Sequence, residues 1–106
     1  MCKTKVGIIG TGNIGTDLLM KVLRSSTLEC GIFAGRNPDS QGIRMAKELG
    51  IPTSIDSIKA IENEPECCDI VFDATSADVH RTNAPILKRL GKFAIDLTPA
   101  HVGKMC

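Results

Sequence analysis

Residues 5–15 read Lys5-Val6-Gly7-Ile8-Ile9-Gly10-Thr11-Gly12-Asn13-Ile14-Gly15. The first five form a short apolar run, which is typical of a strand buried on both faces. The next six match the pattern G-x-G-x-x-G, and an amphipathic segment over residues 13–25 follows at once. The glycine pattern carries meaning in this context, directly after a strand and at the start of a helix. We therefore predict a strand, a tight turn and a helix in succession.

The three glycines of this turn suit the binding of a pyrophosphate. In such a turn Gly10 permits the sharp change of direction, Gly12 leaves room for the phosphates, and Gly15 lets the helix approach the strand. The free N–H groups and the positive dipole end of the helix then attract the anion. We predict a dinucleotide site here; the alternative is a tight turn that binds nothing.

Short apolar runs alternate with amphipathic segments along the rest of the chain. The runs lie at 28–34, 51–53, 69–73 and 92–96, and the helical periods at 40–49, 57–63 and 77–90. This alternation predicts one α/β domain over residues 1–106, with a doubly wound, mainly parallel sheet of about five strands and helices on both faces. We expect Pro85 to kink or restart the last helix. The predicted inward-facing residues are Ile14, Leu18, Leu19, Val22 and Leu23 in the first helix, and Ile43, Ala46 and Leu49 in the second.

Composition excludes several classes of function. The 106 residues carry 13 basic and 12 acidic side chains, so there is no basic field for nucleic acid or an anionic membrane. No apolar run is long enough to span a bilayer, and the N-terminus lacks the pattern of a secretory signal. The five cysteines are an odd number without a C-x-x-C pair, and adjacent Cys67 and Cys68 do not match zinc-ligand spacing. We expect reduced, mostly buried thiols, no metal site and a cytoplasmic location.

The segment after the second strand bears on the choice of nucleotide. Asn37 stands near the place where an acid usually binds the ribose, and Arg36 is beside it. Asn37 can accept a 2′-hydroxyl without repelling a 2′-phosphate, and Arg36 can pair with that phosphate. NAD is the expected cofactor, with NADP also open; Asp39 is a second candidate for the ribose. Alternatively, Asn37 and Pro38 simply begin the next helix, as N-cap and first residue.

The ends of the later strands supply further candidates. Thr75 and Ser76 follow the strand at 69–73, where small residues would let the nicotinamide half lie against the backbone. The alternative there is a capping box with Thr75 as N-cap and Asp78 three residues later. Thr98 is expected to cap a final turn.

The two histidines are weaker candidates. His80 lies inside a predicted helix and is expected to be structural. His101 and Cys106 are five residues apart, and we do not expect them to form a nucleophilic pair, which needs mutual contact and a supporting pocket.

Four segments resemble acylating acetaldehyde dehydrogenases in order and spacing. They are residues 5–18, residues 37–40, residues 69–77, which contain F-D-A-T-S-A, and residues 95–100. The resemblance implies a Rossmann-like domain in which Thr11, Gly12, Asn13 and Ile14 contact the dinucleotide. Asn37 departs from the family, which usually has an acid at this position.

The resemblance also implies a reaction and partners. Such enzymes convert acetaldehyde, NAD and coenzyme A into acetyl-CoA and NADH through a cysteine nucleophile. They pair with a 4-hydroxy-2-oxovalerate aldolase during the breakdown of aromatic compounds. The family's nucleophilic cysteine lies beyond residue 106, so we predict a cofactor domain that is inactive alone and forms homo-oligomers through surface that its missing half covers.

Two other functions remain open at this stage. The chain can be a stand-alone redox sensor, which needs the glycine turn but no nucleophile. It can also belong to a dehydrogenase of the semialdehyde type, because the fold does not distinguish the two enzymes.

Overall fold

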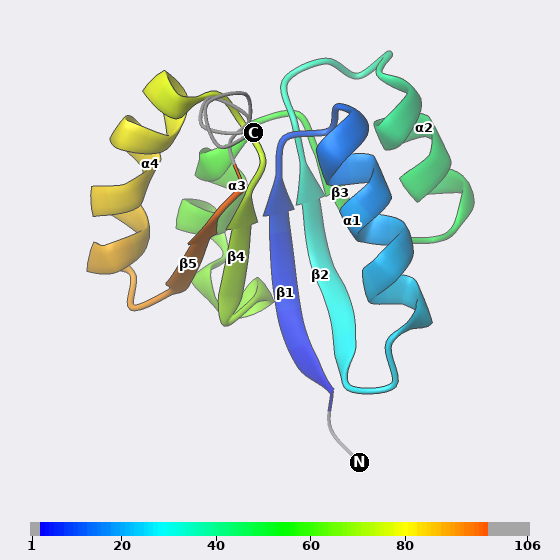
Figure 1. Ribbon diagram of the computed structural model, residues 1–106, viewed down its shortest axis with the longest axis horizontal. Helices are drawn as coiled ribbons and strands as arrows, with labels where there is room; N and C mark the ends of the chain where they lie inside the picture. Colours follow the sequence, from blue (N-terminus) through cyan, green and yellow to red (C-terminus); the bar gives the residue numbers. More distant parts are fainter. Residues whose placement is uncertain (1–2, 98–106) are drawn as a thin grey trace, which may run out of the picture.

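The computed structural model describes residues 3–97, which form one α/β unit (Figure 1). In chain order the elements are β1 (Thr4–Ile9), α1 (Asn13–Arg24), β2 (Leu28–Ala34), α2 (Gln41–Glu48), β3 (Thr53–Ser54), α3 (Ile58–Asn63), the 3₁₀ turn η1 (Pro65–Cys67), β4 (Ile70–Asp73), α4 (Ala77–Arg89) and β5 (Phe93–Asp96). No helix within this described range is long and apolar enough to cross a membrane.

All strand pairs are parallel, and the sheet order is β3-β2-β1-β4-β5. The chain builds outward from β1 to β3, crosses over to β4 beside β1, and then builds outward on the other side to β5. The carboxyl ends of the strands point to the same edge, uppermost in Figure 1. Ligands of open parallel sheets bind at this edge, where the strand order reverses. The predicted doubly wound fold is confirmed.

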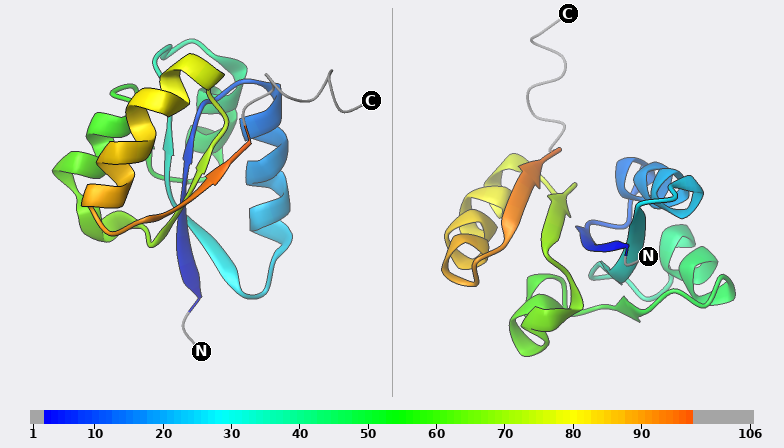
Figure 2. Two further views of the ribbon diagram at one scale, coloured as in Figure 1. Left: turned by 60° about the vertical axis from the view of Figure 1, so that its left-hand side comes forward. Right: turned by 90° about the horizontal axis from the view of Figure 1, so that it is seen from below.

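Helices cover both faces of the sheet, α1 and α2 on one and α3 and α4 on the other (Figure 2). Strand residues alternate between the faces, so Val6 and Ile8 enter one core cluster and Ile9 the other. The first cluster is completed by Leu19, Val22, Cys30, Phe33, Ile43 and Ala46, and the second by Ile61, Cys68, Val71 and Leu87.

The inward faces of α1 and α2 are narrower than predicted. Ile14, Leu23 and Leu49 are 40%, 39% and 50% exposed. Leu49 is the C-cap of α2, beyond the last regular turn, and Ile14 and Leu23 lie next to buried Gly15 and Val22 in the first and last turns of α1. The prediction for these three positions was wrong because the helical period alone does not fix how wide the buried face of a helix is.

Two other local predictions need correction. α4 continues through Pro85 as one helix, so it does not restart there. Pro85 is exposed, and a carbonyl that loses its helical partner on the wet side can bond to water. The third strand is Thr53–Ser54 rather than 51–53, because Pro52 has no N–H and joins the sheet only by accepting from the Phe33 N–H at 2.9 Å.

Candidate functional site

Three strand-to-helix turns meet at the carboxyl edge of the sheet around a cavity of about 350 Å³. Its lining comes from the ends of β1, β2 and β4 and from the residue before α3, namely Gly10, Thr11, Gly35, Arg36, Asn37, Thr75, Ser76 and Ser57. A neighbouring cavity of about 520 Å³ lies over the first turns of α1 and α2 and is lined in part by Thr11, Gly12, Asn13 and Ser40. The structure therefore brings together most of the predicted site residues.

The glycine turn after β1 is built by the absence of side chains. Gly10 has φ of +102°, and a Cβ there would lie 2.7 Å from the carbonyl oxygen of Ala74. A Cβ on Gly15 would lie 1.8 Å from the carbonyl oxygen of Gly10, so the helix packs directly on the turn. Gly12 differs, because no protein atom lies within 4 Å of its Cβ position. That open space lies where a pyrophosphate would approach.

The backbone N–H groups in the first turn of α1 have no side-chain cap. Gly12 is the N-cap and no side chain accepts from the first-turn N–H groups. α2 and α4 are capped instead, because the Ser40 hydroxyl accepts from the Ile43 N–H and the Ser76 hydroxyl from the Val79 N–H, both at 3.2 Å. The residues of this turn thus fit a bound pyrophosphate, whose oxygens would take the place of a cap.

The end of β2 is open and polar. Arg36 and Asn37 are exposed, and Arg36 forms no ion pair with any residue in 3–97. The Asn37 side-chain oxygen accepts from the Asp39 N–H at 2.9 Å, which closes a local turn. The predicted N-cap at Asn37 is therefore wrong, since Ser40 caps α2 and also bonds Thr11 through their hydroxyls at 3.2 Å.

The end of β4 differs from both. Thr75 does not cap α4, because its hydroxyl and N–H both bond the carboxylate of Asp73. Ser76, one residue later, is the cap, so the predicted Thr75–Asp78 capping box is wrong. Asp73 is fully buried, and Nδ1 of His80, predicted as a structural residue in a helix, bonds to its carboxylate at 2.8 Å.

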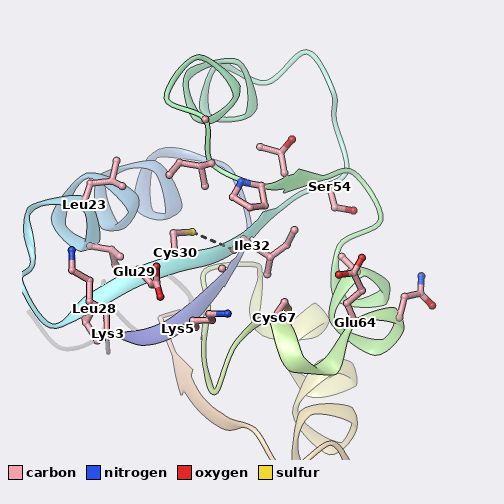
Figure 3. A pocket seen from close by; sticks show the side chains of 18 of the residues that line it. Lys3, Lys5, Leu23, Leu28, Glu29, Cys30, Ile32, Ser54, Glu64 and Cys67 are labelled. Atoms are coloured by element: carbon pink, nitrogen blue, oxygen red, sulfur yellow. Dashed lines mark hydrogen bonds between the residues drawn. The ribbon is translucent and has the colours of Figure 1, made fainter. Parts of the chain in front are cut away.

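A larger cavity of about 820 Å³ lies elsewhere, along β2 and beside the short β3 (Figure 3). Lys5, Glu29 and Cys67 border it, and the Cys30 thiol is turned back onto the Ile32 carbonyl at 3.4 Å. It shares no residue with the glycine turn. Its lining mixes both charge signs, with no converging set of polar groups, so we place the site at the three turns instead.

Two of the three described thiols, Cys30 and Cys68, are buried and poor nucleophiles. Burial raises the pKa of Cys30 to about 11 and that of Cys68 to about 12. Cys67 is half-buried just before β4, at the opposite end of that strand from the three turns. No group of three His, Cys, Asp or Glu residues within 3–97 is placed to hold a metal ion. Cys2, Thr98, His101 and Cys106 lie outside the described residues.

A model of the semialdehyde dehydrogenase NAD-binding domain matches residues 5–102. This chain belongs to that family. Among curated relatives, it is 55% identical over 104 residues to an acetaldehyde dehydrogenase of Pectobacterium atrosepticum, covering 98% of this chain and 35% of the relative. It is 57% identical over 100 residues to that of Thermomicrobium roseum, covering 93% and 32%. The chain thus spans about a third of the length of these relatives.

Solved structures share the fold of this NAD-binding domain. GenD2 from gentamicin A biosynthesis, solved in complex with NAD, matches with a TM-score of 0.77 at 17% identity over 91% of this chain and 27% of its own. An Agrobacterium radiobacter oxidoreductase in complex with NAD⁺, L-tartaric acid and magnesium matches with a TM-score of 0.76 at 18% identity, over 90% and 27%. Membership of an NAD-binding family agrees with the predicted cofactor, and the resemblance to acetaldehyde dehydrogenases is confirmed.

Sequence reasoning missed several residues of this NAD-binding domain. Ser57, which has φ of +51°, lines the cavity of about 350 Å³ at the three turns. The Ser40 hydroxyl bonds to that of Thr11. It also missed that His80 and Asn83 converge on Asp73. Their spacing of three residues on a helix that follows a strand-ending aspartate was the available signal.

Proposed function

We propose that this chain is the cofactor domain of an acylating aldehyde dehydrogenase, which oxidises acetaldehyde with NAD and coenzyme A to acetyl-CoA and NADH. The identity of 55% to a curated acetaldehyde dehydrogenase carries the proposal. The uncapped first turn of α1, open at Gly12, supports the binding of a dinucleotide there. Relatives with this name also favour acetaldehyde over the wider semialdehyde class.

The residues of the three turns would divide the cofactor among them. The N–H groups after Gly12 would hold the pyrophosphate, with Thr11, Asn13 and Ile14 around it. Arg36 and Asn37 would meet the adenosine ribose, and Thr75 and Ser76 the nicotinamide half. When bound, the nicotinamide supplies the hydride acceptor; the turns only hold and orient it.

The nucleophile would come from outside this chain, in the remaining length that the relatives have. Cys30 and Cys68 are buried with raised pKa values, and Cys67 lies at the wrong end of β4. The 106-residue chain alone would therefore be inactive. Phe93 on the outer strand β5 is 66% exposed, which suits contact with further chain or another copy in a homo-oligomer.

The parent enzyme would act in the cytoplasm and take its aldehyde from a 4-hydroxy-2-oxovalerate aldolase in the breakdown of aromatic compounds. A complex of the two enzymes would pass the reactive aldehyde from one to the other without releasing it. Co-purification of the full-length enzyme with such an aldolase tests this partner, and two separate elution peaks at micromolar concentration would count against it.

The function itself is tested by fluorescence titration of the chain with NADH and NADPH. We expect saturable binding that weakens at least about tenfold in Gly12→Val, because the valine side chain occupies the phosphate space. The same chain should show no coenzyme A-dependent oxidation of acetaldehyde. Turnover by the purified chain, or equal NADH binding by Gly12→Val, would overturn the proposal.

A further inference from the structure

A buried carboxylate ends β4 at the edge of the candidate site. Asp73 is fully buried and has four hydrogen-bonding contacts. One oxygen, Oδ1, accepts from the Thr75 N–H at 3.0 Å and from the Thr75 hydroxyl. The other, Oδ2, lies 2.8 Å from Nδ1 of His80 and accepts from Nδ2 of Asn83 at 3.2 Å. These hydrogen bonds compensate for the burial of the carboxylate, so both of its oxygens are satisfied within the protein.

The two oxygens serve different parts of the molecule. Oδ1 bonds the loop between β4 and α4, and Oδ2 bonds α4 itself. Asp73 therefore ties the loop to the helix. The loop in turn packs against the glycine turn, since a Cβ on Gly10 would lie 2.7 Å from the Ala74 carbonyl oxygen. Thr75 and Ser76 of this loop line the same cavity as Gly10.

Within residues 3–97, His80 is the basic side chain that bonds to Asp73. An ionised carboxylate only accepts, so the proton of the His80–Asp73 bond sits on Nδ1. The other ring nitrogen, Nε2, lies 3.7 Å from Oδ2 of Asp96 at the end of β5. The nearest charged neighbours on α4, Asp78 and Arg81, pair with each other and are largely exposed. The imidazole thus stands between the last residues of two adjacent strands.

We propose that Asp73, His80 and Asn83 form a positioning site that holds Thr75 and Ser76 in place for the nicotinamide half of the dinucleotide. This inference rests on the proposed function, because the half that it names is that of the proposed cofactor. None of the three residues lines the cavity, so each acts through the loop. The donor that matters most is Nδ1–H of His80, because its loss leaves Oδ2 with a single neutral partner in a buried setting.

Two substitutions at His80 separate this role from packing. In His80→Asn the amide nitrogen replaces Nδ1 as donor to Asp73, whereas in His80→Gln the nitrogen sits near the position of Nε2. We expect NADH affinity to fall about tenfold in His80→Gln and to stay within about twofold of wild type in His80→Asn. AMP, which lacks the nicotinamide half, should bind both variants and wild type equally. If His80→Gln does not fold, Asn83→Leu takes its place in the experiment, because it removes the other donor from α4 to Asp73.

The outcomes distinguish this inference from the proposed function. Equal NADH affinity in wild type and His80→Gln would overturn the positioning site, as would parallel losses for NADH and AMP. If wild type binds no NADH, the proposed function fails, and amide hydrogen exchange of Thr75 decides the positioning site on its own. Exchange should be faster in His80→Gln than in His80→Asn and wild type; equal rates would contradict the proposal.

Discussion

The turns after β1 and β4 stand side by side and are built in opposite ways. Both join a parallel strand to a helix at the same edge of the sheet. The first is made of backbone, with Gly15 against the carbonyl of Gly10. The second is made of side chains, with Thr75 and α4 bonded to the carboxylate of Asp73.

This difference decides which hydrogen-bonding groups are left for a ligand. In the β4 turn Ser76 caps the helix and Asp73 takes up the Thr75 donors, so the polar groups are satisfied within the protein. In the β1 turn no side chain caps α1, and the space at Gly12 is open. The β1 turn, with its free N–H groups, suits the binding of an anion. The β4 turn, whose side chains are fixed by internal hydrogen bonds, suits the positioning of a ligand that the β1 turn binds.

The largest effect should come from adding one methyl group to the backbone-built turn. Gly15→Ala places a Cβ 1.8 Å from the Gly10 carbonyl oxygen and should lower the free energy of unfolding by about 3 kcal/mol or more. Gly12→Ala meets no protein atom within 4 Å, so it should change stability by less than about 0.5 kcal/mol while weakening NADH binding. Urea denaturation measures both. Equal losses of stability would show that the glycines act alike.

The side-chain-built turn should break when its carboxylate is lost. Asp73→Asn keeps the shape but turns an acceptor into a donor facing donors, and should cost about 2–3 kcal/mol of stability. Asp78→Asn is the matched control, because Asp78 is 84% exposed in its pair with Arg81 and should matter by less than about 0.5 kcal/mol. Thermal or urea unfolding compares them. Two equally stable variants would remove Asp73 from the account of this turn.

We expect the β2 turn to select between NADH and NADPH. Arg36→Ala should weaken NADPH binding about tenfold and NADH binding less than about twofold, because only NADPH has a 2′-phosphate for the guanidinium. Asn37→Asp should also weaken NADPH binding, because the new carboxylate would repel the 2′-phosphate. Parallel fluorescence titrations give the two ratios. An unchanged NADPH to NADH ratio in both variants would place the ribose elsewhere.

The smallest effect concerns the core, away from all the turns. The pKa values of Cys30 and Cys68 are raised from 9.0 to about 11 and about 12, so the folded chain keeps protons that the unfolded chain loses. Their stabilising contribution is complete below about pH 9 and is lost as pH rises through the folded values. At pH 10 the titration of each thiol should lower the free energy of unfolding by about 1 kcal/mol relative to pH 8.

Urea unfolding at the two pH values measures this loss, and Cys30→Ala serves as control because it removes one of the two thiols. Its stability should fall less between pH 8 and pH 10 than that of wild type. An unfolding free energy that stays constant over this range would mean that the thiols titrate as in the unfolded chain.

The same contrast explains what could be predicted from sequence. The β1 turn depends on adjacent residues, so the glycine pattern predicted its shape and the fold. The sequence offers Asn37 and Thr75 as possible caps of α2 and α4, but Ser40 and Ser76 cap these helices, because several neighbouring residues can cap a helix and packing selects one. The spacing of His80 and Asn83 places both on one face of α4, but their contact with Asp73 depends on how that face lies on β4.

The dinucleotide site that we propose lies where the β1 and β4 turns meet. A series of ¹H–¹⁵N NMR spectra of the chain with increasing NADH tests it most directly, since each backbone amide reports separately. We expect the largest shifts at Gly10, Gly12 and Thr75. Shifts centred on Gly31 and Ile51, which line the larger cavity beside β2, would contradict it.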